Sequence, residues 1–389
     1  MQVDCSQVLS YLDGCRGEML RLWETIVRLE TPSTNPEAVD RLASHLDTFC
    51  GALGMDTAFF RPQGAGTCLS ARTRAGTGCP VLLLGHMDTV HPVGSFPGGP
   101  WRLEGGSVYG PGAHDCKGGL VIALYVIRAL QHAGYDRRQL RLALVSDEET
   151  AHTLSQGQTV DFLRREAQGC GAAFTFESGL PDGSVVTRRK GGGIVQLQVR
   201  GIASHAGTAP EQGASAVLEA ARKIVAIQAL SDPAHTTFNC GIIHGGTSAN
   251  VVPDRCEVSV ALRFHTNRDR DEALSALQSI CGRVETPGTQ CTLSPLAGFP
   301  AMEETDRTAA LFALYRETST ALGLGTPESV YSAGCSDSAY TTALGIPTLC
   351  ALGVLGQGQH SPDEHAFADS LLPQAKRLAA AILALPDDF

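Results

Sequence analysis

The 389-residue sequence has no apolar run of 18 residues, no CxxC pair, no internal repeat and no low-complexity tract. The absence of a long apolar run excludes a membrane-spanning helix. The 13 cysteines are scattered singly, and the chain is long enough to be stable without disulfide bonds. Their odd number also leaves at least one cysteine unpaired. We therefore expect reduced cysteines in an ordinary globular protein, and the length favours two domains.

Positive charge is also scarce, because 30 Lys and Arg residues stand against 40 Asp and Glu residues and the net charge is -10. This balance repels a nucleic-acid backbone and an anionic membrane, so we expect neither as a partner and favour a small-molecule substrate. The first twenty residues carry Asp4, Asp13 and Glu18 and lack an apolar core of signal-peptide length. This pattern predicts a cytoplasmic protein.

Continuous apolar runs bounded by turn residues predict strands that are buried on both faces. The four runs are 81–84, 140–145, 172–176 and 346–352. Between the first two lies a helical pattern over 117–133, closed by Gly134. Strand, helix and strand in this order predict an α/β domain whose sheet is mostly parallel, with helices on both faces.

The middle of the chain has a different pattern, because apolar and polar residues alternate over 194–201 and 256–264. Such strands bury one face only. Helical patterns at 213–229 and 269–284, with two further short strands, make the order β-α-β-β-α-β. We predict an inserted α+β domain of ferredoxin-like type over 190–298. The catalytic domain would then comprise 1–189 and 299–389.

Polar side chains that can bind a metal follow every predicted buried strand. These are His86 and Asp88, then Asp147, Glu148 and Glu149, then Glu177, and finally His360. Ligands of open α/β sheets bind beyond the carboxyl ends of the strands, so we expect these side chains at one edge of the sheet.

Each of these residues alone has an ordinary interpretation as a loop histidine or an exposed acidic turn. Asp115, just before the predicted helix, would by itself be a helix N-cap. Several carboxylates crowded at one edge would repel one another unless cations neutralised them. Two histidines and three carboxylates match a pair of zinc ions.

At this point the sequence resembles a family of two-zinc metallopeptidases, the aminoacylase, succinyl-diaminopimelate desuccinylase and bacterial glutamate carboxypeptidase type. The resemblance rests on GHMDTV, YGPGAHDCKGG, SDEE, FES, SHAG, TSANVVPD, ALRF and HSPDEH, in the family's order. It covers nearly the whole chain. The glutamate carboxypeptidase branch is the most similar, chiefly through YGPG and the interval from SHAG to NVVPD.

The resemblance implies two zinc ions, with cobalt or manganese as alternatives. Asp115 would bridge both metals. His86 and Glu177 would complete one metal site. Glu149 and His360 would complete the other.

The resemblance also implies residues that act without binding metal. Asp88 would orient His86, and Glu148 would be the general base because it must stay free to accept a proton. The peptide bond between Asp115 and Cys116 is expected to be cis.

Three residues of the inserted domain gain roles from the same resemblance. His205 would reach the active site of the partner subunit in a homodimer formed through the inserted domains. Asn250 and Arg263 would hold the terminal carboxylate of the substrate. Strand alternation places Arg263 on the polar side, where its planar fork suits a carboxylate, although an exposed surface arginine is the alternative.

We therefore expect hydrolysis of the amide bond between an acyl or peptidyl group and a C-terminal amino acid, in a small N-acyl amino acid or a short peptide. An N-acyl-amino-acid deacylase is one alternative, and a non-catalytic, metal-dependent peptide-binding protein is another. The loop after Glu149 is longer than the family's usual one, and Arg188, Arg189 and Lys190 precede the inserted domain. These two features leave the preferred acyl group and side chain open.

Overall fold

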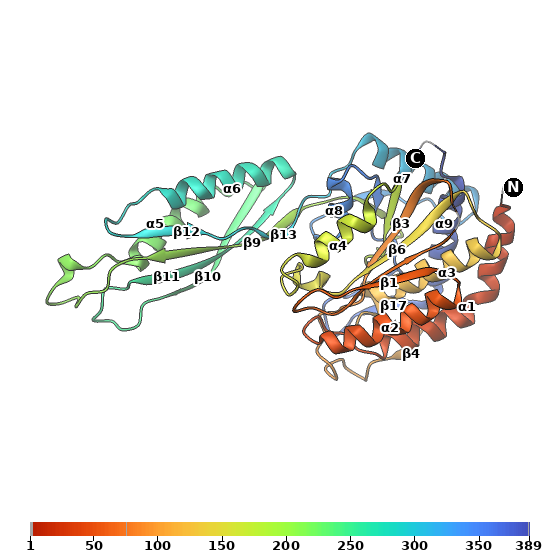
Figure 1. Cartoon of the computed structure of the whole chain (residues 1–389), viewed down its shortest axis with the longest axis horizontal. Helices are drawn as coiled ribbons and strands as arrows, with labels where there is room; N and C mark the ends of the chain where they lie inside the picture. Colours follow the sequence, from red (N-terminus) through yellow and green to blue (C-terminus); the bar gives the residue numbers. More distant parts are fainter. Residues whose placement is uncertain (1–2, 75, 388) are drawn as a thin grey trace. The chain divides into compact units, whose positions relative to one another are not determined.

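The computed structural model describes residues 3–74, 76–387 and 389, which separate into two compact units (Figure 1). Unit 1 comprises the described residues up to Arg188 together with 303–332 and 336–389. Unit 2 comprises 189–302 and 333–335. The segment 190–298, expected from sequence as an insertion, lies within unit 2.

Unit 1 contains a six-stranded sheet with the strand order β1-β2-β6-β3-β7-β15. Its strands are β1 (Asp56–Phe60), β2 (Cys68–Arg72), β3 (Gly78–His86), β6 (Arg138–Val145), β7 (Ala172–Thr175) and β15 (Thr348–Leu349). The pairings among β6, β3, β7 and β15 are parallel, whereas β1 pairs with β2, and β2 with β6, in antiparallel fashion. The sheet is therefore mixed, with three parallel pairings of five, because an N-terminal hairpin, which the apolar runs did not reveal, extends one side of it.

Helices cover both faces of this sheet. They are α1 (Cys5–Val27), α2 (Pro36–Ala52), α3 (Gly118–His132), α4 (Gln158–Ala167), α7 (Asp306–Ala321), α8 (Ser338–Ala343) and α9 (Leu371–Ala384). Leu69 and Ala71 of β2 join the core cluster that includes α1, α3 and α9, whereas Ser70 between them hydrogen-bonds to Glu166 of α4. Successive strand residues point to opposite faces, so α4 lies on the face opposite to α3.

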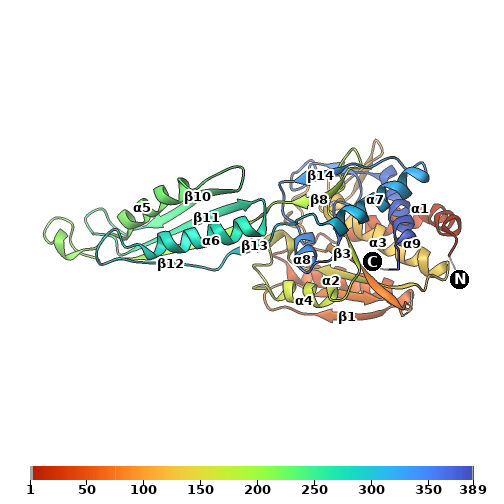
Figure 2. The same ribbon diagram turned by 90° about the horizontal axis from the view of Figure 1, so that it is seen from above.

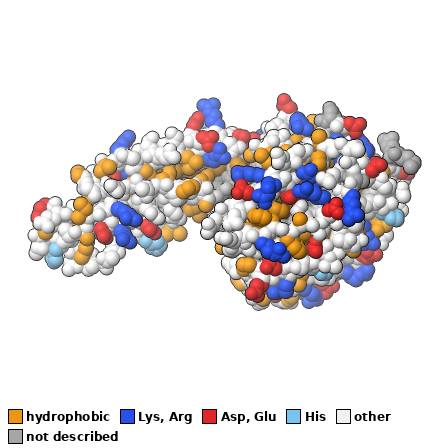
Figure 3. Space-filling view, viewed as in Figure 1, with side chains coloured by type: hydrophobic (Ala, Val, Ile, Leu, Met, Phe, Trp, Pro, Cys, Tyr) orange, Lys and Arg blue, Asp and Glu red, His pale blue; other side chains and the backbone are white. Residues whose placement is uncertain are grey.

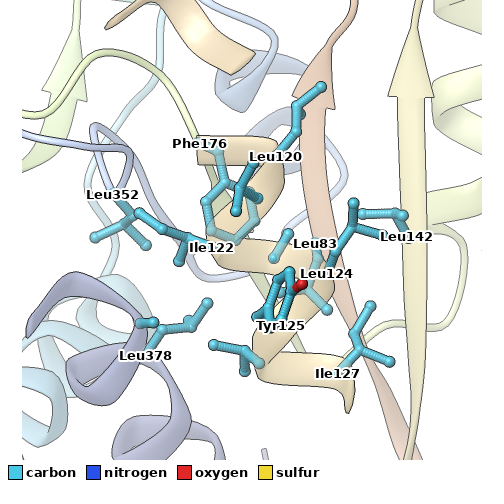
Figure 4. Close-up of a cluster of buried hydrophobic side chains, with 14 of the residues drawn as sticks. Leu83, Leu120, Ile122, Leu124, Tyr125, Ile127, Leu142, Phe176, Leu352 and Leu378 are labelled. Atoms are coloured by element: carbon cyan, nitrogen blue, oxygen red, sulfur yellow. The ribbon is translucent and has the colours of Figure 1, made fainter. Parts of the chain in front are cut away.

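Helix α3 is buried on nearly all sides. Leu83 of β3 and Leu142 of β6 lie on one side of it, and Leu352 and Leu378 lie on another (Figure 4). Burial of each such leucine contributes roughly 1.5–3 kcal/mol. This packing fixes the start of α3, where Asp115 lies, relative to the strand ends.

Short strands complete unit 1. A four-stranded sheet has the order β16-β17-β5-β4, and β8 pairs with β14. Their bounds are β4 (Arg102–Glu104), β5 (Ser107–Tyr109), β16 (Gly356–Gln357), β17 (His365–Phe367), β8 (Val185–Arg189) and β14 (Ser329–Ser332). Strand β16 is the element that precedes His360.

Unit 2 has the element order β9, α5, β10, β11, α6, β12 and β13, and the sheet order β10-β11-β9-β12 with β13 also on β9. The bounds are β9 (Gly191–Arg200), α5 (Ala216–Gln228), β10 (Thr236–Gly245), β11 (Arg255–Phe264), α6 (Asn267–Gly282), β12 (Gln290–Leu293) and β13 (Ala297–Phe299). Helices α5 and α6 lie side by side against the sheet (Figure 2). Every second residue of β11, from Cys256 to Phe264, is buried, as alternation requires for a half-buried strand.

Among the described residues, no helix is both long and apolar enough to cross a membrane. On the face of unit 1 drawn in Figure 3, acidic and basic side chains are interspersed rather than gathered by sign.

Candidate metal centre

Five polar side chains of unit 1 are candidate metal ligands, and three of them lie at or just after the ends of its parallel strands. We call them the rim cluster: His86, Asp115, Glu149, Glu177 and His360. His86 is the last residue of β3, Glu149 lies in a short helix (Glu148–Thr150) after β6, and Glu177 follows β7. Because β3, β6 and β7 run parallel, their carboxyl ends meet at one edge of the sheet.

Asp115 lies between two histidines. Its Oδ1 is 3.2 Å from Nε2 of His86, and its Oδ2 is 3.4 Å from Nε2 of His360. The same nitrogen of His360 is 2.9 Å from Oε2 of Glu149. The expected cis bond between Asp115 and Cys116 is present. One carboxylate thus offers a separate oxygen to each imidazole, which is the arrangement of a bridging ligand.

The donor atoms fit a metal. Ligand atoms of His86, Asp115 and Glu149 all lie within 4.8 Å of one another. Tetrahedral zinc with bonds of about 2.0–2.2 Å separates its ligand atoms by roughly 3.4 Å. Imidazole nitrogens and carboxylate oxygens are also the donors that zinc prefers in catalytic sites. These residues could therefore hold a metal ion with little rearrangement.

The histidines and carboxylates of the rim cluster shift the pKa values of one another. Burial alone would raise the pKa of Asp115, but hydrogen bonds from His360 and His86 outweigh it and hold that pKa well below its usual range. Hydrogen bonds to Asp115 and Glu149 raise the pKa of His360 to about 10. A metal ligand must be deprotonated, so metal binding here must displace protons.

Asp88 ties His86 to the turn that carries the two glutamates. Nδ1 of His86 lies 3.0 Å from the Asp88 carbonyl oxygen and 3.5 Å from its Oδ1. The Asp88 carboxylate accepts the backbone N–H groups of Glu148 and Glu149 at 3.3 and 3.2 Å, and the Ser33 hydroxyl at 2.7 Å. Asp88 therefore holds the imidazole mainly through its backbone carbonyl and the turn through its buried carboxylate.

Glu148 and Glu177 are both buried, each with 8% of its surface exposed. Burial raises the pKa of Glu148 well above its usual range, and the charge of Glu177 is the next largest cause. A Cβ added at Gly119, near the start of α3, would lie 2.6 Å from the carbonyl oxygen of Phe176. The glycine therefore permits the close approach of the Asp115 and Glu177 segments.

Sequence reasoning missed Glu364, which is 1% exposed. Its Oε1 accepts the backbone N–H groups of His114 and Asp115 at 3.0 and 3.2 Å, and its Oε2 is 2.7 Å from Nε2 of His91. Glu364 therefore fixes the backbone of the central carboxylate. Glu364 is the fifth residue of the HSPDEH motif, which was the signal that could have drawn attention to it.

Sequence reasoning also missed a buried triad of His152, Asp147 and Asp337 beside Glu148. Asp147 was noted only as part of the acidic turn. The basic residues before unit 2 have partners of their own, because Arg188 pairs with Glu304 at 3.1 Å and Arg189 donates to the Gly334 carbonyl at 3.2 Å.

The three expected residues of unit 2 lie in two places. His205 and Asn250 belong to adjoining segments, since His205 bridges to Val251 and the N–H of Ala206 donates to the Asn250 carbonyl. Both side chains are exposed, as is that of Arg263. Arg263 lies near the opposite end of β11, about 27 Å along the strand from Arg255. Unit 2 therefore does not bring Arg263 together with the other two.

A mixed α/β sheet that gathers two histidines and three carboxylates at its carboxyl edge, beside a separate buried glutamate, defines a metal-dependent hydrolase. The chain belongs to Peptidase family M20/M25/M40, whose model matches residues 82–384. It is 28% identical to carboxypeptidase G2 of a Pseudomonas species over 375 residues, which cover 94% of this chain and 88% of that protein.

Two further proteins are similar. Identity to succinyl-diaminopimelate desuccinylase of Corynebacterium glutamicum is 25% over 289 residues, which cover 72% of this chain and 74% of that protein. The structure of an M20 family metallo-carboxypeptidase from Sulfolobus solfataricus aligns with a TM-score of 0.76 at 16% identity, covering 94% of this chain and 99% of that one. The structural match shows a shared fold.

Proposed function

We propose that this enzyme hydrolyses the amide bond between an acyl or peptidyl group and a C-terminal amino acid, with two zinc ions at the rim cluster. The observation that carries this proposal is Asp115, whose two oxygens face two different histidines. Similarity to carboxypeptidase G2 over 94% of the chain favours a C-terminal amino acid as the leaving group.

The metal ligands would divide around Asp115. His86 and Glu177 would hold one ion, and Glu149 and His360 the other. When bound, the metals supply Lewis acidity and a water of lowered pKa.

Glu148 would accept the proton of the attacking water and later donate it to the departing amine, a role that its raised pKa favours. Asp88 would hold His86 and Glu148 in fixed positions relative to each other through the hydrogen bonds described above.

His205 is prepared to donate a hydrogen bond. Its Nδ1 accepts the backbone N–H groups of Gly207 and Thr208 at 3.1 and 3.2 Å, so in the neutral ring the proton is on Nε2. A donor of this kind stabilises the oxyanion of a tetrahedral intermediate. We place His205 and the adjoining Asn250 in the active site of a partner subunit. Arg263, at the far end of β11, would bind the substrate's terminal carboxylate, so Asn250 of the same unit cannot share that carboxylate.

Unit 2 would be the lid and dimerisation domain. Strand β10 is an edge of its sheet, and it carries the exposed Ile242 and Ile243, which are 54% and 48% exposed. Helix α5, which packs against β10, exposes Val225. An exposed apolar edge strand is a ready surface for pairing with a second copy.

A deacylase for N-acyl amino acids is the nearest alternative, and the similarity to succinyl-diaminopimelate desuccinylase supports it. A non-catalytic peptide-binding protein is disfavoured because such a protein needs metal ligands but no general base. The choice among these functions rests on which bond is cleaved.

A screen of zinc-loaded protein against N-acetyl amino acids, N-acyl and folyl glutamates and dipeptides would test the proposal by the amino acid released. We expect release of a C-terminal amino acid from acyl or peptidyl substrates, and none from the Glu148→Gln variant. Preference for N-acetyl amino acids alone would favour the deacylase. Tight substrate binding without any release would favour the binding protein.

A further inference from the structure

The loop that follows Glu149 has an unusual backbone. Ala151, His152 and Gln156 have positive φ values of 51°, 58° and 53°, although none of them is glycine. The left-handed conformation costs a non-glycine residue about 1–2 kcal/mol. Such conformations persist only where the surrounding contacts determine them. Something in this loop must therefore compensate the cost.

The side chain of His152 provides that compensation. It is 2% exposed, and its two ring nitrogens face two carboxylates. Nδ1 is 3.2 Å from Oδ1 of Asp147, and Nε2 is 2.6 Å from Oδ1 of Asp337. An ionised carboxylate only accepts hydrogen bonds, so both ring nitrogens must donate and the ring is an imidazolium.

The charge of this ring is strongly favoured. Burial alone would lower the pKa of His152, but Asp337 and Asp147 outweigh that effect and raise the pKa to about 10. The Tyr340 ring lies 5.8 Å from the imidazole centroid, and Oδ2 of Asp337 has no hydrogen-bond partner among the described residues. The imidazolium is therefore the main compensation for two buried negative charges.

We call the contacts of His152 with Asp147 and Asp337 the clamp. The clamp includes Asp147, which is the residue before Glu148. The Asp147 carboxylate also accepts the backbone N–H of Ser155 at 2.9 Å, and the Asp147 carbonyl accepts that of His152 at 3.0 Å. Asp337 immediately precedes α8. The triad thus ties the segment of Glu148 both to its own loop and to a distant part of unit 1.

We infer that His152 is a positioning residue, whose imidazolium between Asp147 and Asp337 holds Glu148 in place for proton transfer. This inference rests on the proposed function of Glu148. It also gives the longer loop a purpose, because the loop brings His152 into the triad from a left-handed turn. His152 contacts Asp147, the residue before Glu148, so its effect on proton transfer passes through Asp147.

Replacement of His152 by Gln tests the clamp. We expect kcat to fall about 10-fold to 100-fold, the loss typical of a catalytic group displaced by about 1 Å, with KM and metal content unchanged. Adding Asp337→Asn to this variant removes one of the two uncompensated charges. The double variant should have a kcat at least fivefold higher than that of His152→Gln alone. The matched control Ala151→Gly relieves the neighbouring strained residue without touching the imidazole, and it should keep kcat within twofold.

Several outcomes would overturn the clamp. These are wild-type kcat in His152→Gln, a loss of kcat that follows the loss of metal or folded protein, and a double variant no better than the single one. If His152→Gln does not fold, nitrogen-15 NMR of the wild-type ring decides, because an imidazole that is neutral at pH 8.5 would contradict the triad.

Amide hydrogen exchange separates this inference from the proposed function. Faster exchange of residues 150–157 in His152→Gln, but not in Ala151→Gly, is expected even if no tested substrate is cleaved. Unchanged exchange in both variants would refute the clamp whatever the enzyme's activity.

Discussion

The rim cluster of unit 1 and the polar loops of unit 2 hold their side chains in opposite ways. In the rim cluster, His86, Asp115 and Glu177 are 1%, 7% and 8% exposed, His86 and Asp115 share a direct contact, and the side chain of His360 is the exposed one. His205 and Asn250 are exposed side chains whose hydrogen bonds stay within their own loops. The rim cluster is organised by contacts within unit 1, whereas the loops of unit 2 would act only in the dimer that we propose. Substitutions should therefore act locally at the rim and through assembly in unit 2.

The largest expected effect is the loss of activity on replacing Glu148, and it distinguishes Glu148 from its neighbour Glu149. Glu148→Gln should reduce kcat by about 1,000-fold or more, because the proposed general base is lost, while the metal content stays unchanged. Glu149→Gln should also lower the metal content, because a proposed ligand is lost. Steady-state kinetics and metal analysis of the two purified variants provide the measurement.

Equal metal loss in the two glutamate variants would contradict their different roles. Glu257→Gln, an exposed substitution in unit 2, is a suitable control because it removes a glutamate far from the rim in sequence.

The next largest effect is the loss of turnover expected when His205 of unit 2 is replaced. His205→Ala should reduce turnover about 100-fold to 1,000-fold, the usual loss for one oxyanion donor, with unchanged metal content. Mixing His205→Ala subunits with Glu148→Gln subunits should then restore up to about a quarter of the wild-type activity, because one site of each mixed twofold dimer is intact. If verified subunit exchange gives no recovery, His205 does not act across a dimer.

Much of the rim could be predicted from the sequence, because apolar runs that end in His86, Glu148 and Glu177 reveal buried parallel strands. The hairpin β1–β2 could not, since β1 is largely exposed and has no apolar run. Two contacts that support the rim cluster, between residues 185 and 273 positions apart in sequence, were missed for another reason. The pairs His152–Asp337 and His91–Glu364 follow no spacing rule, because tertiary packing alone brings them together.

A third effect is on stability and depends on pH. The pKa of His152 is raised from 6.5 to about 10, so its charge stabilises the folded state fully below about pH 6.5, and this contribution declines as the pH rises to about 10. Chemical unfolding of the metal-free protein between pH 7 and 10 should show falling stability. The His152→Gln variant that also carries Asp337→Asn should show a shallower fall, and equal slopes would contradict the charge of the ring.

The smallest expected effect tests the basic residues that precede unit 2. The Arg188 side chain is 54% exposed, and it is already paired with Glu304 at 3.1 Å. An exposed ion pair of this kind contributes about 0–1 kcal/mol, so Arg188→Ala should barely change stability. If Arg188 has no part in choosing the substrate, kcat/KM should stay within twofold for both acidic and neutral acyl groups. A loss confined to acidic acyl groups would show instead that Arg188 exchanges Glu304 for the substrate, and specificity would then begin at the entrance to unit 2 rather than at the rim.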